Sequence, residues 1–215
     1  MTGAQTSGKY AIKAAVTGAD AVYGEAVDTS SSVKATLTYK VEADVTFTEV
    51  AMYVVTYNGR EIETAEAGAT VTFTSTFSSD SSDAVLLVNK DVDTAGTSTT
   101  GSLAHAGNVV AYQINASDAS SNVIAIVDGY KVTISGNSGS DAVEAGSGSD
   151  TVNTTNYVAV GAAVTATPDT GRNVASVNTT TGSSPVTLTS GTLGTADSVI
   201  VFKMPAAAVT VTFDA

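Results

Sequence analysis

Three shortages in this chain of 215 residues each exclude a class of protein. It has no cysteine, which rules out disulfides, thiolate metal sites and a cysteine nucleophile. Lysine and arginine together number 9 against 21 aspartates and glutamates, and the resulting net charge of -12 repels phosphate groups. No apolar run approaches the ~20 residues that a helix needs to cross a bilayer. We therefore expect neither nucleic acid as a partner nor insertion into a membrane.

The chain is also poor in charge of both signs. Charged residues make up 14% of it, against roughly a quarter in an ordinary globular protein. Solubility must therefore depend on threonine, serine, asparagine and glycine. The first ten residues, "MTGAQTSGKY", lack the hydrophobic core of a signal peptide. An exported form would be one from which a leader has been removed.

Alternation of apolar and polar residues with a period of two occurs throughout, whereas helical periodicity is nearly absent. The clearest stretch, "LTYKVEADVTFT" at 37–48, predicts one continuous strand with a buried face. The buried face would hold Leu37, Tyr39, Val41, Ala43, Val45 and Phe47. The chain ends in the same manner, with Val209, Val211 and Phe213 on one face of a strand. The pattern predicts an all-β fold.

Two stretches of the sequence are versions of one another. "TTGSLAHAGNVVAYQI" at 99–114 matches "TSGTLGTADSVIVFKM" at 189–204 at a constant offset of 90, without a gap. Upstream, "AGATVTFT" at 67–74 matches "VGAAVTAT" at 160–167, and "LLVNKD" matches "ASVNTT", each at a slightly different spacing. Because both order and spacing recur, an internal repeat is favoured over chance similarity.

The repeat predicts two tandem β-rich modules, sandwich-like or β-grasp-like, behind an N-terminal strand section. The expected division is 1–50 for the N-terminal section, 51–126 for the first module and 127–215 for the second. A partial third copy is a further possibility, with Tyr39 matching Phe202 and Val45 matching Val209 if one residue is dropped. Alternating strands resemble one another for structural reasons too, so this match stays open.

The second module resembles the tandem repeats of bacterial surface proteins, of the divergent internalin B-repeat type. In that family a "V..G..VT.TP..G..V..V" stretch leads to an "F.MP...VTVT." ending. The matching residues are Val160, Gly161, Val164, Thr165, Thr167, Pro168, Gly171, Val174, Val177, Phe202, Met204, Pro205, Val209, Val211 and Phe213. The resemblance implies a small β-rich module of a multi-unit protein that is extracellular or on the cell surface, and it brings no catalytic residues with it.

The sequence departs from this family pattern in two places. Arg172 stands where the family often has an aromatic residue, and the first module has no "MP" before its last strand. The subtype is therefore open.

The sequence offers little for catalysis. His105 is the single histidine, its counterpart in the second module is Thr195, and no "GxSxG" motif accompanies it. An exposed loop histidine is the expected interpretation, and an enzyme is the least supported class.

Calcium is the one cofactor that the acidic loops make a candidate, because it takes 6 to 8 oxygen ligands. Asp80 and Asp83 form one cluster, and Asp91 and Asp93 a second. A third holds Asp141, Glu144 and Asp150. None follows an EF-hand or nonapeptide pattern, and solvated acidic loops are the alternative.

The termini supply the leading functional hypothesis. A strand left at a sheet edge carries unpaired N–H and C=O groups that recruit another strand. "GKYAIKAAVTG" at 8–18 is predicted to be such a strand, able to add itself to the sheet of a neighbouring subunit. The candidate subunit-joining residues are Tyr10, Ile12, Val16, Val209, Val211 and Phe213. We expect a structural subunit of an extracellular filament, pilus-like fibre or surface layer, whose partners are copies of itself.

Two alternatives remain at this point. An adhesin or carbohydrate-binding stalk would bind glycans through exposed rings among Tyr10, Tyr23, Tyr57, Tyr130 and Tyr157. A phage tail or capsid decoration protein is the other alternative. Asn115, Asn153 and Asn178 begin glycosylation sequons, which matter only where the modifying machinery exists.

Overall fold

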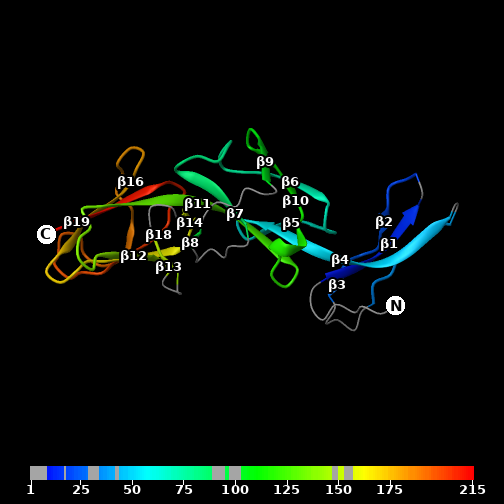
Figure 1. The fold of residues 1–215 in the computed structure, drawn as a ribbon, viewed down its shortest axis with the longest axis horizontal. Coiled ribbons are helices and arrows are strands. Elements are labelled where there is room, and N and C mark those ends of the chain that lie inside the picture. Colours follow the sequence, from blue (N-terminus) through cyan, green and yellow to red (C-terminus); the bar gives the residue numbers. More distant parts are fainter. Residues whose placement is uncertain are drawn as a thin grey trace. The chain divides into compact units, whose positions relative to one another are not determined.

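A computed structural model gives the fold of the chain and confirms that it is all-β (Figure 1). It describes residues 9–16, 18–28, 34–41, 44–88, 95–96, 103–146, 150–152 and 157–215. Within these residues the only helical element is a single 3-10 turn, Ala116–Asp118. No helix in the described part is long and apolar enough to cross a bilayer.

The strands group into two compact units. Unit 1 comprises Met1–Phe73, Ser102–Ala104 and Ala111–Ala125, and unit 2 comprises Thr74–Gly101, His105–Val110 and Ile126–Ala215. Strand β11 (Val123–Ser135) begins in unit 1 and continues in unit 2. The three-part division at residues 50 and 126 stays a prediction.

Unit 1 is built on an antiparallel sheet around two long neighbours, β1 (Lys9–Val16) and β4 (Val45–Tyr57). The short strands β2 (Val22–Tyr23) and β3 (Val27–Asp28) pair with the other edge of β1. Strand β5 (Arg60–Ala65) pairs with the second half of β4. Asn58 and Gly59 join β4 to β5 with φ angles of 48° and 78°, which is the hairpin turn that an Asn-Gly pair favours.

Unit 2 contains a β-sandwich. In one sheet β19 (Val209–Asp214) lies between β16 (Asn173–Thr179) and β11, and β7 (Ala84–Val88) and β14 (Tyr157–Ala159) also pair with β11. Strand β8 (Ala95–Gly96) pairs with β14. The other sheet has the order β13 (Asp150–Thr151), β12 (Ala142–Ala145), β15 (Ala163–Thr167), β18 (Ile200–Lys203), β17 (Leu188–Ser190).

One hydrophobic core lies between these two sheets. Their inward residues alternate along each strand with outward polar ones, which is the pattern that buries one face of a strand. The largest of the fully buried side chains here include Phe202, Ile200, Met204 and Val132.

A third sheet reproduces part of this sandwich. Strands β6 (Thr70–Thr74), β10 (Val109–Gln113) and β9 (Leu103–Ala106) pair in the order β6-β10-β9, and each strand has residues in both units. By the repeat found in the sequence, β6 and β10 correspond to β15 and β18, whereas β9 corresponds to residues 193–196, a turn that follows β17. The buried residues correspond as well: Val110 with Ile200, Tyr112 with Phe202, and Ile114 with Met204.

The turns before β6 and β15 share their backbone hydrogen bonds. The amide of Gly68 donates to the Ile114 carbonyl at 2.8 Å, and the amide of Gly161 donates to the Met204 carbonyl at 2.8 Å. Both glycines have positive φ, 88° and 82°, a conformation that costs glycine little and other residues more. The sequence match at 67–74 and 160–167 thus coincides with a shared backbone structure.

Sequence inspection missed a further correspondence, between the two longest strands. β4 and β11 each have 13 residues. Tyr53 of β4 lies opposite Ala65, and Tyr130 of β11 lies opposite Val158. Aligned on these tyrosines, "VAMYVVTY" at 50–57 matches "VDGYKVTI" at 127–134. The correspondence between β4 and β11 is supported by the pairing register of the two tyrosines, in addition to this short sequence match.

The continuous strand predicted at 37–48 is wrong. The described residues 34–41 lie outside any strand, and β4 begins at Val45. Val41 is 61% exposed and Phe47 is 49% exposed, whereas Leu37, Tyr39 and Val45 are half-buried, so the predicted face is only partly buried. Alternation establishes which side chains share a face, but burial also requires a covering layer. Ala43 lies outside the described residues.

Candidate functional site: the N-terminal sheet

The predicted joining strand β1 is confirmed as a strand, but it is not an open edge. All eight residues of β1 pair with β4, from Lys9 opposite Met52 to Val16 opposite Val45. On its other edge β1 pairs with β2 and β3. Tyr10, Ile12 and Val16 are half-buried on one face of this sheet. Their backbone groups are therefore paired inside the chain over most of the strand.

The C-terminal strand β19 is more deeply enclosed. It pairs in parallel with β11 along one edge and antiparallel with β16 along the other. Val209, Val211 and Phe213 are buried in the core of unit 2, with at most 3% exposure. A strand from another subunit would have to displace β11 or β16 to pair here. These residues belong to the core of unit 2, and their role in joining subunits stays a prediction.

Strand β4 lies between β11 and β1 in its sheet. Strand β5 pairs with β4 only from Tyr53 to Tyr57. Asn122, just before β11, accepts from the Val54 amide at 2.9 Å and donates its side-chain amide to the Met52 carbonyl at 3.2 Å. Residues 45–52 of β4 pair with β1.

A group of three polar side chains connects β1, β2 and the end of β5. The ammonium of Lys13 and the hydroxyl of Tyr23 both donate to the same oxygen of Glu66, the latter at 2.8 Å. The hydrogen bond to Glu66 is the main cause of the raised pKa of Lys13. Burial raises the pKa of Glu66, but the donors Lys13 and Tyr23 outweigh it, so that pKa lies below its usual range. Sequence spacing gave no sign of this group.

A cavity of about 440 Å³ adjoins this group within unit 1. Met52 lies in its wall, together with Tyr23, Glu63, Thr64 and Glu66. Tyr23 is 39% exposed. The cavity therefore combines an accessible aromatic ring with carboxylate and hydroxyl groups.

The first predicted acidic cluster is only partly assembled. Asp80 lies 3.4 Å from Nε2 of His105, and it accepts from the Leu86 amide at 3.2 Å. Asp83 is exposed near the start of β7. The His105 ring stacks on Phe77, with centroids 5.9 Å apart, so the expectation of an exposed loop histidine is wrong. Asp91 and Asp93 lie outside the described residues.

The Asp141 cluster is held by protein groups. The Asp141 carboxylate accepts from the amides of Asp169 and Ser138 at 2.7 and 2.8 Å, and from Nε of Arg172 at 2.9 Å. Glu144 and Asp150 lie on the neighbouring strands β12 and β13, opposite Thr151 and Ala145. Nowhere in the described ranges do three or more His, Asp or Glu side chains gather to hold a metal ion. Calcium binding stays a prediction.

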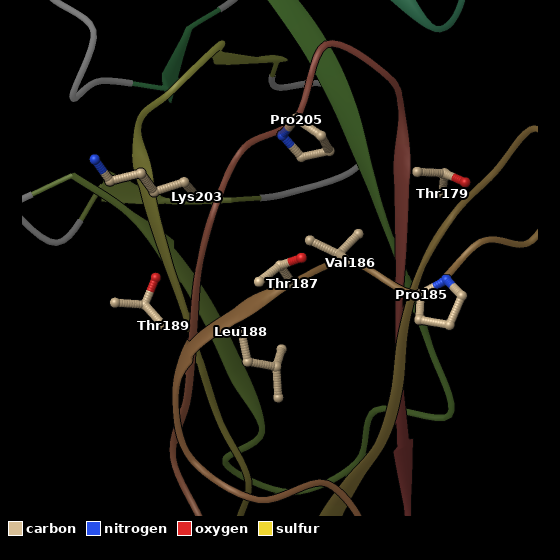
Figure 2. A pocket seen from close by; sticks show the side chains of 8 residues that line it. All are labelled: Thr179, Pro185, Val186, Thr187, Leu188, Thr189, Lys203 and Pro205. Carbon is tan, nitrogen blue, oxygen red and sulfur yellow. The ribbon is translucent and has the colours of Figure 1, made fainter.

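Unit 2 has a second cavity, of about 450 Å³, around β17 (Figure 2). Pro185 and Pro205 lie on either side of Val186, and the ammonium of Lys203 points away from them. Thr179, Thr187, Leu188 and Thr189 complete the lining. The lining consists of apolar side chains, threonine hydroxyls and one lysine ammonium. These groups do not point to a particular class of ligand.

The whole chain was compared with known proteins of three kinds. No family model, no curated protein and no solved structure matches it.

Proposed function

We propose that this chain is a structural subunit of an extracellular assembly, joined to copies of itself by β-strand addition. The observation that carries the proposal is the recurrence of one β module along the chain. The strand pairs β6-β10 and β15-β18 have the same buried positions and the same turn hydrogen bonds. Repetition of this kind preserves packing positions and multiplies surface, which suits a protein that spaces or joins other parts.

The resemblance of the second module to bacterial surface repeats supports the same proposal. Three of the residues that carry the resemblance, Val164, Phe202 and Val211, are fully buried. These side chains pack the core of the sandwich. The resemblance therefore concerns the fold of the module and leaves its surface residues free to differ.

The test is the state of association of the full chain. We expect sedimentation to rise with protein concentration, and negative-stain electron microscopy to show regular polymers. A chain that remains monomeric up to about millimolar concentration would overturn the proposal. Its free energy of association would then be weaker than about -4 kcal/mol, the value that corresponds to a Kd of ~1 mM. Deleting Met1–Gly18 would be an ambiguous test, because it removes β1 and unpairs β4.

The cavity beside Tyr23 favours a second candidate, the binding of a glycan. A sugar ring packs its C–H face on an aromatic ring and donates its hydroxyls to carboxylates. Tyr23, Glu63 and Glu66 provide these groups in one place. On a glycan array, we expect binding that Tyr23→Ala removes and that Tyr157→Ala leaves intact. Binding that is equal for both variants would contradict this assignment.

A further inference from the structure

The strands β11 and β19 of unit 2 lie side by side and run in the same direction. The last part of β11 pairs in parallel with β19, from Val132 opposite Val209 to Ser135 opposite Thr212. The other neighbours of these two strands in unit 2, β7, β14 and β16, all pair with them antiparallel. The chain therefore leaves β11, forms the strands of the segment 136–208, and returns beside β11 in the direction in which it left.

Contacts beyond the paired residues hold β11 and β19 together. Gly136, directly after β11, lies so close to β19 that a Cβ there would be 2.3 Å from the carbonyl oxygen of Phe213. The Gly136 carbonyl accepts from the Arg172 guanidinium at 2.6 Å, and Nε of the same side chain donates to Asp141 at 2.9 Å. The other edge of β19 pairs with β16. Sliding β19 along its own axis would therefore break contacts on both of its edges.

Parallel pairing decides how tension acts on the backbone hydrogen bonds. Tension that enters β11 from its N-terminal side and leaves β19 at its C-terminal end acts at opposite ends of the pair. It draws the two strands past one another, so the hydrogen bonds between the four residue pairs share the load. When two paired strands are instead pulled apart from the same end, the load falls on one residue pair at a time, and the pairs open in succession.

We propose that the pairing of β11 with β19 is a mechanical clamp, by which unit 2 resists tension along the chain. The inference rests on the proposed function for the source of the tension, because the subunits of a fibre or surface layer transmit load to one another. The resistance itself depends on unit 2 alone. While the clamp is intact, tension crosses directly from β11 to β19 and bypasses the segment 136–208. Because forced unfolding follows the unfolding rate, such a module can resist load without unusual equilibrium stability.

Two single-cysteine variants of the full chain apply load in these two directions, because the chain has no cysteine of its own. Lys131→Cys places a thiol at the N-terminal end of the clamp, on the face of β11 that it shares with the exposed Thr133. Asn137→Cys places a thiol in the exposed loop just beyond the other end. In an atomic force microscope, each thiol is held by one handle and a tag appended after Ala215 is held by the other. The first variant loads the clamp in shear, and the second peels it open.

We expect Lys131→Cys to rupture at a force at least about twofold higher than Asn137→Cys, because several hydrogen bonds share the load only in shear. Both variants should release about 80 residues, a gain in length of roughly 26 to 29 nm, so the same event is compared. Urea denaturation should give the two variants the same midpoint, since each changes one outward side chain. A force ratio below about two would overturn the inference.

A pair of alanine variants tests whether the close approach of the two strands carries the resistance. Gly136→Ala places a Cβ against the Phe213 carbonyl. Gly194 has a similar φ, 71° against 68°, but a Cβ there would meet no atom within 4 Å. When load is applied through Lys131→Cys, we expect Gly136→Ala to lower the rupture force and Gly194→Ala to leave it unchanged. Equal rupture forces would count against the clamp, and if Gly136→Ala does not fold, the comparison of the two load directions decides.

The force measurement and the sedimentation test of the proposed function fail separately. If the chain associates but the two load directions rupture at similar forces, the clamp is wrong and the proposed function stands. If the chain stays monomeric while the shear direction is the stronger, the proposed function is wrong, and the clamp is a property of unit 2 whose load has another source.

Discussion

Individual buried charges fix the loops at one end of the sandwich in unit 2. The Asp141 side chain has no exposed surface, and its three donors come from Ser138, Asp169 and Arg172. Burial raises the pKa of this carboxyl, but the Asp169 and Ser138 amides and then Arg172 outweigh it, so the pKa lies below its usual range. A carboxylate used in this way serves the fold, which explains why acidic residues in a loop need not indicate calcium.

The first prediction concerns this carboxylate. Asp141→Asn should lower the free energy of unfolding by about 1 to 3 kcal/mol at pH 7, because an amide nitrogen cannot accept from Arg172. A group whose pKa is lowered by folding stabilises above its unfolded pKa of about 3.9, and that contribution is lost as the pH falls through the folded pKa. The difference between variant and wild type should therefore shrink below about pH 4.

Urea denaturation at pH 7 and pH 3 measures it. Asp83→Asn is the control, since it removes one negative charge from an exposed loop and should change stability by less than about 0.5 kcal/mol. An equal loss for Asp141→Asn at both pH values would show that its charge is irrelevant.

At the scale of elements, backbone fit at a few glycines decides whether a strand can pack. Gly191 follows β17 with a φ of 93°, and a Cβ there would clash with the Val199 carbonyl next to β18. Gly171 also has a positive φ, 79°, but a Cβ there would meet no atom within 4 Å. The two positions separate backbone strain from steric clash.

We predict that Gly171→Ala costs only the left-handed backbone term, about 1 to 2 kcal/mol. Gly191→Ala should cost clearly more, because backbone atoms of the neighbouring strand must also shift. Equilibrium unfolding in urea compares the two variants directly. Equal costs would mean that the Val199 carbonyl moves freely and that steric clash adds nothing at Gly191.

Prediction from sequence succeeded for elements where the information is local. The strands at 9–16 and 209–214, the Asn-Gly hairpin and the repeat at offset 90 were all visible as alternation, turn chemistry or self-similarity. The edges of the strands were not visible. Whether the edge beside Tyr10 is free depends on partners distant in sequence: the joining role was predicted for β1, and the structure pairs that strand with β4, β2 and β3.

At the scale of the whole molecule, net charge opposes association of any two copies. Each chain carries a charge of -12, and the Debye length falls from about 30 Å at 0.01 M salt to about 3 Å at 1 M. Strand addition joins uncharged backbone groups, so salt should screen the repulsion without weakening the proposed contacts. We expect the dissociation constant, measured by sedimentation, to fall several-fold between about 20 mM and 500 mM sodium chloride.

Association that weakens as salt rises would instead require attraction between opposite charges across the interface. That result would contradict strand addition through uncharged backbone groups as the way in which subunits join.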